Sequence, residues 1–430
     1  MGEKLENMLI VQKFGGSSVA DAARISRVAA IIGEAYRAGN QVVVVLSAQG
    51  DTTDDLIAKA REINPKPDKR EMDMLLSVGE QISVSLMAME LQKHRIPAVS
   101  LCGWQIGLTT TGSHTAGRIE TIDTGRILRE LESEKVVLIA GFQGIDHAGD
   151  ITTLGRGGSD TTAVAVAAVL HADRCQIFTD VEGVFTADPR KVPGARLLKS
   201  ITYDEMLELA SSGSQVLHNR SVELAKQYGV VLEVLSSFLQ RPGTKVQEAT
   251  RDVERMIISG VAKDDHIARV TVGRVPDRPG AALKLFQVLS DNSVNVDNIC
   301  QSASGSGRSD IGFTVAEDDA DTARTLLQKA RPEVGYEALS VTRDVSKVSI
   351  VGAGLLASPG MAVRMFEALT EENINISMIS SSEIKLSVVI PKSDADRAVA
   401  AIHGKFFGTG ERLTLPGTRI RKGERENAGL

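Results

Sequence analysis

The chain contains an internal duplication, and this repeat constrains its fold more than any other feature. After about residue 245, two segments show the same order of predicted elements: strand, Pro-Gly loop, helix, two strands, helix and strand. Aligned on Pro279-Gly280 and Pro359-Gly360, the copies match at several apolar helix positions. The period of about 80 residues is too long for one solenoid unit, so we predict tandem domains at 264–342 and 345–416.

The first 245 residues have a different pattern, in which short apolar runs alternate with helical stretches. The runs 41–47 and 136–142 are continuous and rich in β-branched residues, as expected for strands buried on both faces, and a further run follows at 174–180. Strand–helix alternation favours an α/β domain with an open, mainly parallel sheet between helices. Ligands of such sheets bind at the carboxyl ends of the strands. We therefore predict a domain over 1–245 with its site at those strand ends.

Composition excludes several classes of protein. The 430 residues carry a net charge of −6, which gives no basic surplus for nucleic-acid binding. The three cysteines are far apart and lack metal-ligand spacing, which favours a reducing compartment. We find no signal-peptide segment and no apolar run near the roughly 20 residues that span a bilayer. We therefore expect a cytoplasmic protein with neither nucleic-acid nor membrane partners.

The segment KFGGSS (13–18) combines a lysine with two glycines between a predicted strand and a helix. No GxxxxGK[ST] motif occurs, so this is not a P-loop. Gly15 and Gly16 would let backbone N–H groups approach an anion, and a helix start adds favourable partial charge. Lys13 would offset the charge of a transferring phosphoryl group. The alternative is a strand-end lysine followed by a flexible turn.

The segment GRGGSD (155–160) places an arginine and an aspartate around a second glycine-rich turn. Arg156 is suited to hold a carboxylate through two hydrogen bonds. Asp160 stands at the start of a predicted helix, where the simple role is that of an N-cap. Ser159 is an equally good cap, so Asp160 is also free to orient Lys13.

Glu80 is the only charge in the segment 74–89, which is apolar or small on almost every side. Such a helix is expected to be buried, and a buried carboxylate is costly unless it is paired. Its partner is either a structural arginine or the ammonium group of a ligand, and the residues leave both open. An arginine for a carboxylate, a glutamate for an ammonium and a lysine for phosphate together suit an amino-acid kinase or ligase.

Six ordered motifs resemble those of aspartate kinases (aspartokinases): KFGGSS, SAQGDTTDD, EMDMLLSVGEQIS, AGFQG, TTLGRGGSDTTAVAVAA and TDVEGVFTADPR. The duplicated segments resemble the ACT domains of the monofunctional members, and the resemblance extends from about residue 9 to 410. It implies an amino-acid kinase fold followed by two ferredoxin-like βαββαβ ACT domains. It also implies transfer of the γ-phosphoryl group of MgATP to the β-carboxylate of L-aspartate. The product, 4-phospho-L-aspartate, begins the synthesis of lysine, threonine and methionine.

The resemblance assigns a role to each matching residue. Lys13 would stabilise the transferring phosphoryl group, and Asp160 would orient Lys13. Arg156 would hold the α-carboxylate of aspartate and Glu80 its ammonium group. The phosphates would hold Mg²⁺, so no metal ligand is assigned. The remaining contacts are Gly15, Gly16 and Ser17 for phosphate, Ser47, Thr53 and Ser159 for the substrate, and Thr179, Asp180, Val184, Asp188 and Arg190 for the nucleotide.

One position departs from the family pattern. Many relatives have a lysine that contacts the nucleotide phosphates where this chain has Gln215, in GSQVLHN. Either another cation substitutes for that lysine, or the contact is dispensable in this branch.

The ACT resemblance implies an effector site for lysine, threonine or both, without choosing between them. The second copy has Ala357 where the first has Asp277, so we expect the first to supply most polar contacts. The simpler role of Asp277 is to cap the turn before the proline. We also expect a homo-oligomer, or an α₂β₂ assembly with a C-terminal fragment from an internal start near Met256. The predicted effector contacts are Asp277, Gly280, Ala281, Asn295, Asp297 and Gln301.

Three other functions compete with this one. The segment VSIVGAGLLA (348–357) fits a dinucleotide fingerprint, but Pro359 follows at once, and serines 380–382 stand where a ribose-binding acid is expected. A catalytically inactive amino-acid sensor is disfavoured because all four candidate charged residues are present. A sister kinase acting on another amino acid is disfavoured by the C-terminal pair.

Overall fold

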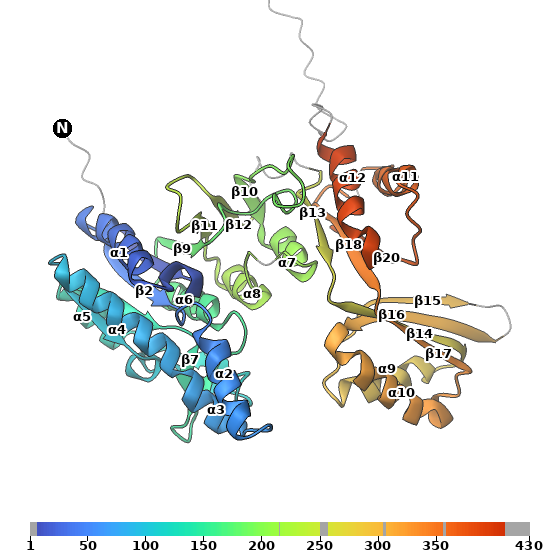
Figure 1. Ribbon diagram of the computed structural model, residues 1–430, viewed down its shortest axis with the longest axis horizontal. Helices are drawn as coiled ribbons and strands as arrows, with labels where there is room; N and C mark the ends of the chain where they lie inside the picture. The colour runs from blue at the N-terminus through green and yellow to red at the C-terminus, as the bar shows by residue number, and fades with distance from the viewer. Residues whose placement is uncertain (1–6, 215, 250–256, 304–306, 356–357, 409–430) are drawn as a thin grey trace, which may run out of the picture. The chain divides into compact units, whose positions relative to one another are not determined.

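The chain forms two compact units, Met1–Phe185 with Leu197–Ala249, and Thr186–Arg196 with Thr250–Leu430. The computed structural model describes residues 7–214, 216–249, 257–303, 307–355 and 358–408 (Figure 1). Gln215, Met256 and Ala357, on which three of the predictions depend, lie outside these described residues.

The first unit is built on an eight-stranded sheet with the order β10-β12-β11-β9-β1-β2-β6-β3. The neighbouring strands β9, β1, β2 and β6 run parallel, and Lys13 lies opposite both Val45 and Ile177. This confirms the open, mainly parallel sheet and brings four carboxyl ends to one edge. The strands are β1 (Leu9–Phe14), β2 (Gln41–Leu46), β3 (Ala98–Leu101), β6 (Val136–Ala140), β9 (Arg174–Thr179), β10 (Ser200–Thr202), β11 (Leu232–Ser236) and β12 (Thr244–Gln247).

Helices pack against this sheet through alternate strand residues, which point to opposite faces. Val42 and Val44 share a buried cluster with α1 and α4, while α6 contacts β1, β2 and β9. A small second sheet has the order β5-β4-β7-β8. The helices are α1 (Ala22–Arg37), α2 (Thr52–Ile63), α3 (Lys69–Leu76), α4 (Val78–Lys93), α5 (Gly125–Glu132), α6 (Gly158–Val169), α7 (Tyr203–Ser211) and α8 (Asn219–Tyr228), and the small strands are β4 (Thr109–Thr111), β5 (Arg118–Thr121), β7 (Gln143–Ile145) and β8 (Ile151–Thr153).

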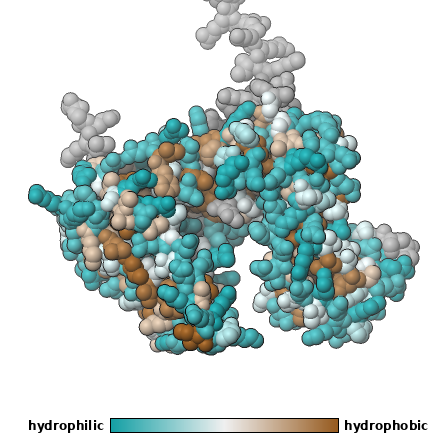
Figure 2. Space-filling view, viewed as in Figure 1, coloured by the Kyte–Doolittle hydropathy of each residue, from teal (hydrophilic) through white to brown (hydrophobic). Residues whose placement is uncertain are grey.

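The prediction of a fully buried helix over 74–89 is wrong. Two helices, α3 and α4, meet at Ser77, and only one side of α4 packs against the core. The other side forms an exposed apolar stripe, seen as brown side chains over α3 and α4 in Figure 2. Composition alone did not reveal which side has no neighbour. The stripe consists of Met74, Val78, Ile82, Leu86 and Met89, each 38–63% exposed.

The stretch Lys69–Lys93, which includes α3 and α4, is long and apolar enough to cross a membrane by length and composition only. Half of that window is buried inside the first unit, where α4 packs against α1 and the sheet. Since a buried core helix passes the same test, the packing accounts for the composition.

In the second unit, the first repeat is a complete βαββαβ fold with the sheet order β15-β16-β14-β17. All of its strand pairs are antiparallel, as the sequence predicts. Its elements are β14 (Ile267–Pro276), α9 (Ala281–Ser290), β15 (Asp297–Ala303), β16 (Arg308–Ala316), α10 (Ala320–Val334) and β17 (Ala338–Thr342).

The second repeat takes its outer strand from a different part of the chain. Its sheet has the order β13-β18-β20-β19, and β13 (Gly260–Asp264), which precedes the first repeat, pairs with β18 antiparallel. The predicted boundaries at 264 and 345 do not anticipate this strand exchange. The other elements are β18 (Val345–Val351), α11 (Met361–Glu371), β19 (Met378–Ser381), β20 (Lys385–Pro391) and α12 (Ala395–Phe407).

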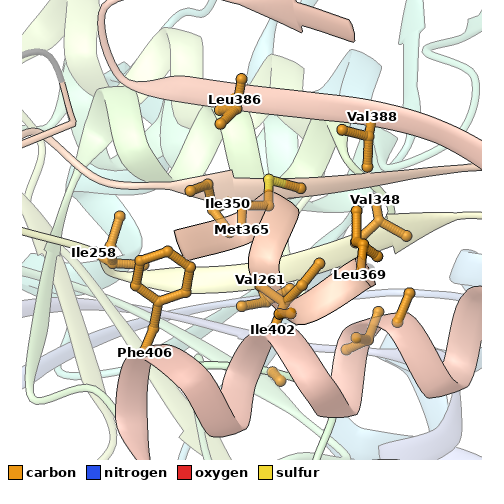
Figure 3. Close-up of a cluster of buried hydrophobic side chains, with 14 of the residues drawn as sticks. Ile258, Val261, Val348, Ile350, Met365, Leu369, Leu386, Val388, Ile402 and Phe406 are labelled. Atoms are coloured by element: carbon orange, nitrogen blue, oxygen red, sulfur yellow. The ribbon is translucent and has the colours of Figure 1, made fainter. Parts of the chain in front are cut away.

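A buried apolar cluster fixes β13 in the second repeat. Val261 of β13 lies among side chains of β18, β20, α11 and α12 (Figure 3). Gly352 and Gly354, the glycines of the dinucleotide-like fingerprint, lie against the chain just before β13. A methyl group on Gly352 would be 2.1 Å from the carbonyl oxygen of Ile257. Close backbone packing therefore accounts for these glycines without a dinucleotide.

Candidate active site

The candidate site lies where β9, β1, β2 and β6 end. Phe14, the last residue of β1, lies opposite Leu46 and Phe178, so the residues that follow these three strands share one edge of the sheet. The rings of Phe14 and Phe178 stack with their centroids 4.5 Å apart.

Lys13 and Asp160 form an ion pair at this edge. The Lys13 Nζ atom lies 2.6 Å from Asp160 Oδ1, and the two side chains are 12% and 13% exposed. The ion pair joins β1 to α6, two elements far apart in sequence. The N-cap alternatives for Asp160 and Ser159 are wrong, because α6 begins at Gly158 and Gly157 occupies the cap position.

The glycine loop turns sharply beside Lys13. A short 3₁₀ helix, η1 (Gly16–Val19), begins directly after Gly15, and a methyl group on Gly15 would lie 3.6 Å from Lys13 Nζ. The N–H groups of Gly16 and Ser17 donate to no acceptor among the described residues. At a helix start such groups lack intrahelical partners. The loop therefore offers free donors to an anion next to a lysine.

Gly16 also brings the loops after β1 and β2 into contact. Its carbonyl oxygen accepts from the Gly50 N–H at 3.1 Å, and a methyl group on it would lie 2.5 Å from the Ala48 oxygen. Ser47 directly follows β2, and its N–H donates to the Phe14 carbonyl oxygen at 3.2 Å, while Thr53 lies in the first turn of α2. Both predicted substrate residues are therefore on elements next to the glycine loop.

Glu80 lies in the first turn of α4 and is 4% exposed. Its Oε1 atom accepts a hydrogen bond from the Ala48 N–H at 3.1 Å, while Oε2 is buried and has no partner in the described parts of the chain. Burial raises the pKa of Glu80 to about 7. The structural-arginine alternative is not found among the described residues, so one buried carboxylate oxygen remains free for a ligand.

Arg156 projects from the turn before α6. It is exposed, and it makes no ion pair or hydrogen bond with any residue that the structure describes. Gly155 and Gly157 have φ angles of +76° and +69°, a region that favours glycine. Ser159 is buried and packs against Gly141, which follows β6.

The predicted nucleotide residues divide between the two units. Thr179 and Asp180 follow β9, and the Thr179 hydroxyl donates to Asp180 at 3.1 Å. Val184 is buried, and its N–H and C=O both hydrogen-bond within the protein, so its main chain offers no free group. Asp188 and Arg190 belong to the second unit and form an ion pair of 2.9 Å.

Two residues near Arg156 were missed in the sequence. A methyl group on Gly157 would lie 2.3 Å from the ring of His218, so the turn presses against this histidine. Arg220 of α8 donates from Nη1 to the Leu154 oxygen at 3.0 Å, and burial lowers its pKa. Both lie shortly after Gln215. No motif in this segment indicates a functional role for His218 or Arg220, and only the absence of the expected lysine distinguishes it.

The predicted effector residues lie on the first repeat, and most are exposed. Asp277 precedes the Pro-Gly turn, and its carboxylate has no hydrogen bond within the described part of the chain, so the turn-cap alternative gains no support. Gly280 caps α9 with a φ of +88°, and Ala281 is buried as the first residue of that helix. Asn295 precedes β15 and is exposed. The side chain of Gln301 donates to Ser309 at 3.1 Å.

Asp297 is held by a lysine of the second repeat. Lys347 Nζ lies 2.7 Å from Asp297 Oδ2, and the two side chains are 3% and 52% exposed. Burial raises the pKa of Asp297, but the charge and hydrogen bond of Lys347, the Lys385 charge and the Asn298 N–H together hold that pKa below its ordinary value. This cross-repeat pair was not predicted, because 50 residues separate its partners.

The sheet, the polar residues at its edge and the paired C-terminal repeats define an amino-acid kinase joined to ACT domains. The sequence model of the amino acid kinase family matches residues 8–236. The ACT domain model matches twice, at residues 270–330 and 348–406.

Known relatives narrow this class. An aspartokinase of Bacillus sp. (strain MGA3) is 48% identical over 94% of this chain and 98% of its own length. One of Mycolicibacterium smegmatis is also 48% identical, over 95% of this chain and 99% of its own. A structure of E. coli aspartokinase III with aspartate and ADP is similar at 26% identity and a TM-score of 0.80, covering 93% and 100% of the two chains. The chain belongs to the aspartokinase family, and its activity is phosphoryl transfer to aspartate under allosteric regulation.

Proposed function

We propose that the enzyme transfers the γ-phosphoryl group of MgATP to the β-carboxylate of L-aspartate at a site centred on Lys13. The observation that carries this proposal is the 2.6 Å Lys13–Asp160 ion pair beside the glycine loop. A lysine held in place by an aspartate is preorganised to stabilise charge that develops during transfer. The product, 4-phospho-L-aspartate, would begin the synthesis of lysine, threonine and methionine.

The reaction requires charge stabilisation but no general base. The β-carboxylate of aspartate is ionised at neutral pH, so one of its oxygens attacks the γ-phosphorus directly. The bond from that phosphorus to the bridging oxygen breaks, and ADP leaves with the electron pair. Lys13 and the free N–H groups of Gly16 and Ser17 supply positive charge on the phosphate side. Asp160 positions Lys13 and abstracts no proton.

The same geometry supports a separate place for the amino-acid substrate. Glu80 presents a buried oxygen without a partner, which suits the substrate ammonium group. Arg156 has a free guanidinium group on a glycine turn, which suits the α-carboxylate. Holding both groups of the backbone end would direct the β-carboxylate towards the nucleotide.

Mg²⁺ enters this proposal through the nucleotide. Asp160 is committed to its ion pair with Lys13, so we assign no protein ligand to the metal and expect phosphate oxygens to hold it. Bound Mg²⁺ would neutralise part of the phosphate charge during transfer. Thr179, Asp180, Asp188 and Arg190 remain the predicted nucleotide contacts.

The proposal is tested by product formation from MgATP with a panel of amino acids. We expect acyl phosphate, trapped with hydroxylamine, from L-aspartate, and much less from L-glutamate or N-acetyl-L-glutamate. A preference for either glutamate compound would favour the sister-kinase alternative. If ATP is not turned over with any amino acid of the panel, the catalytically inactive sensor would be favoured.

We further propose an effector site for lysine, threonine or both on the first repeat. The free carboxylate of Asp277 suits the effector's ammonium group, while N–H groups at the start of α9 suit its carboxylate. The half-exposed carboxylate of Asp297 would offer a separate place for an ammonium group, because Asp297 lies opposite Thr314 whereas Pro276 lies opposite Arg308, six residues away along β16. Gly280, Asn295 and Gln301 would complete the contacts around them. Effector and substrate should weaken each other's binding reciprocally.

The proposal also covers the oligomeric state of the enzyme and the cellular compartment in which it works. We expect a homo-oligomer in the cytoplasm, or an α₂β₂ assembly if a fragment is also made from a start near Met256. A denaturing gel of protein from the native host, probed for the C-terminal unit, tests the second possibility. A single full-length band would exclude the fragment.

A further inference from the structure

One segment of the kinase sequence folds with the regulatory unit. Thr186–Arg196 groups with the second unit, although the residues on both sides of it belong to the first. The segment is closed at its base by the antiparallel bridge between Phe185 and Leu197. The Thr186 N–H also donates to the Arg196 oxygen at 2.9 Å. It is therefore a closed loop rather than a loose connection.

Apolar side chains anchor this loop in the second repeat. Ala187 and Val192 are 4% and 5% exposed and belong to the buried cluster of β13, β18, α11 and α12, part of which is shown in Figure 3. The Val261 N–H of β13 donates to the Thr186 oxygen at 2.8 Å. The loop thus extends the hydrogen bonding of the sheet that β13 completes.

Polar contacts to α12 reinforce the anchor. The Thr186 hydroxyl lies 2.9 Å from His403 Nε2, and both residues are buried. The His403 ring stacks on Phe407 at 4.6 Å, and burial lowers the pKa of His403, so its imidazole is neutral at pH 7. Outside the core, Lys191 forms an ion pair with Asp396 at 2.7 Å.

The loop carries two of the predicted nucleotide contacts between its anchors. Asp188 immediately follows the buried Ala187, and Arg190 lies two residues before Val192. The Asp188 carbonyl accepts from the N–H groups of Lys191 and Val192 at 3.0 and 2.9 Å, which holds the turn closed. Contacts with the second repeat therefore hold the part of the loop that carries both side chains, while the bridge between Phe185 and Leu197 closes its base.

We propose that Thr186–Arg196 is a tether through which the second repeat positions Asp188 and Arg190 for the nucleotide, with His403 as the positioning residue. This rests on the proposed nucleotide role of the two residues. The second repeat then acts as a connector, because a rearrangement of α12 or β13 displaces these two side chains. Such a rearrangement should change the affinity for ATP and leave the affinity for aspartate unchanged.

Replacing His403 in the full-length enzyme tests this. His403→Leu replaces the imidazole with an apolar side chain of similar size and removes the hydrogen bond to Thr186. We expect the KM for ATP to rise roughly five- to tenfold, the value of one buried hydrogen bond, with the KM for aspartate unchanged. His403→Gln, which retains an amide near the position of Nε2, should restore most of the ATP affinity.

The matched control is Tyr336→Phe in the first repeat. It removes another buried hydrogen bond, from the Tyr336 hydroxyl to the Leu327 oxygen at 3.0 Å, and should leave the KM for ATP unchanged. An equal rise in ATP KM in this control would mean that general destabilisation causes the effect, and would overturn the proposal.

Hydrogen–deuterium exchange separates the tether from the nucleotide role. Backbone exchange over 186–196 should be faster in His403→Leu than in wild type or in Tyr336→Phe. Unchanged exchange there, or faster exchange with an unaltered ATP KM, overturns the proposal.

Arg190→Ala tests the nucleotide role itself. An unchanged ATP KM in that variant would reject the role, whatever the exchange data show.

Discussion

Two ion pairs have the same composition but different exposure. Lys13–Asp160 in the first unit and Lys347–Asp297 in the second have N–O distances of 2.6 and 2.7 Å. In the first pair both side chains are about equally sheltered, and the lysine lies beside the glycine loop. In the second the lysine is buried and the aspartate is half exposed. Under the proposed roles, the lysine would face the ligand in the first pair and the aspartate would face it in the second.

Under the proposed roles, the same kind of ion pair would serve two kinds of ligand. A buried ion needs a partner to offset its desolvation, so each pair fixes one charged group in place. In the proposed kinase site Asp160 would anchor Lys13, which would face phosphate. In the proposed effector site Lys347 would anchor Asp297, which would face an ammonium group. Each pair would hold one charged group in position before the ligand binds.

The largest expected effect comes from removing the presented lysine. Lys13→Ala should lower kcat by about 10³-fold or more, because the lost charge acts mainly in the transition state. Steady-state ADP release with saturating aspartate and MgATP measures it, with circular dichroism as the check on folding. Near-normal turnover in a folded variant would mean that Lys13 does not stabilise the transferring phosphoryl group.

The next effect concerns the exposed carboxylate of Asp277, in the same repeat as Asp297. Asp277→Ala should reduce inhibition by lysine or threonine at least about tenfold, since one charge-assisted contact contributes 1.5–3 kcal/mol, while leaving kcat unchanged. Titrating both amino acids, singly and together, against wild type and variant measures this. Inhibition of equal strength in both proteins would remove Asp277 from the effector site.

The third effect is a pH dependence that only the kinase site should show. The ionised form of Glu80, with a pKa of about 7, is the form that binds an ammonium group. Below pH 7, kcat/KM for aspartate should fall by up to about tenfold per pH unit. Glu80→Gln should have a lower kcat/KM that no longer follows this ionisation. A wild-type profile that is flat from pH 5.5 to 8 would argue against the role.

Glu80 is also expected to affect the stability of the fold. Ionisation of Glu80 should increase kcat/KM for aspartate as pH rises, but it should decrease the free energy of unfolding. Its folded-state pKa is raised above the unfolded value, so its contribution to stability is present at low pH and is lost as pH rises through about 7. Glu80→Gln should therefore be more stable than wild type at pH 8, by at most about 3 kcal/mol. Thermal melts of both proteins at pH 5 and pH 8 measure the difference, which should shrink at the lower pH.

Local sequence patterns predicted much of the fold and the shared edge of the site. The β-branched runs around Val42–Leu46 predicted buried parallel strands, because their composition directly reflects burial on both faces. The duplication predicted two βαββαβ repeats, and the first is confirmed in full. The approach of Lys13 to Asp160 followed from two glycine-rich motifs at strand ends. Their roles in catalysis remain predictions.

Non-local packing accounts for what the sequence did not predict. The exposed side of α4 depends on which neighbours are absent, and its apolar composition resembles that of a core helix. The strand β13 and the loop 186–196 join the second repeat through contacts distant in the chain. In the sequence, nothing distinguishes Lys347 from other strand lysines. Its role depends on the contact with Asp297, which only the fold shows.

The comparison of the two pairs is tested most directly by two isosteric changes, Asp160→Asn and Asp297→Asn, measured for both kcat and inhibition by the effector. We predict that Asp160→Asn lowers kcat by about 10- to 100-fold, as for other groups that orient a functional residue, and leaves fractional inhibition intact. Asp297→Asn should keep kcat and lose inhibition, in a protein shown by its thermal melt to be folded. The account is contradicted if Asp160→Asn keeps full turnover, or if Asp297→Asn remains as sensitive to the effector as wild type.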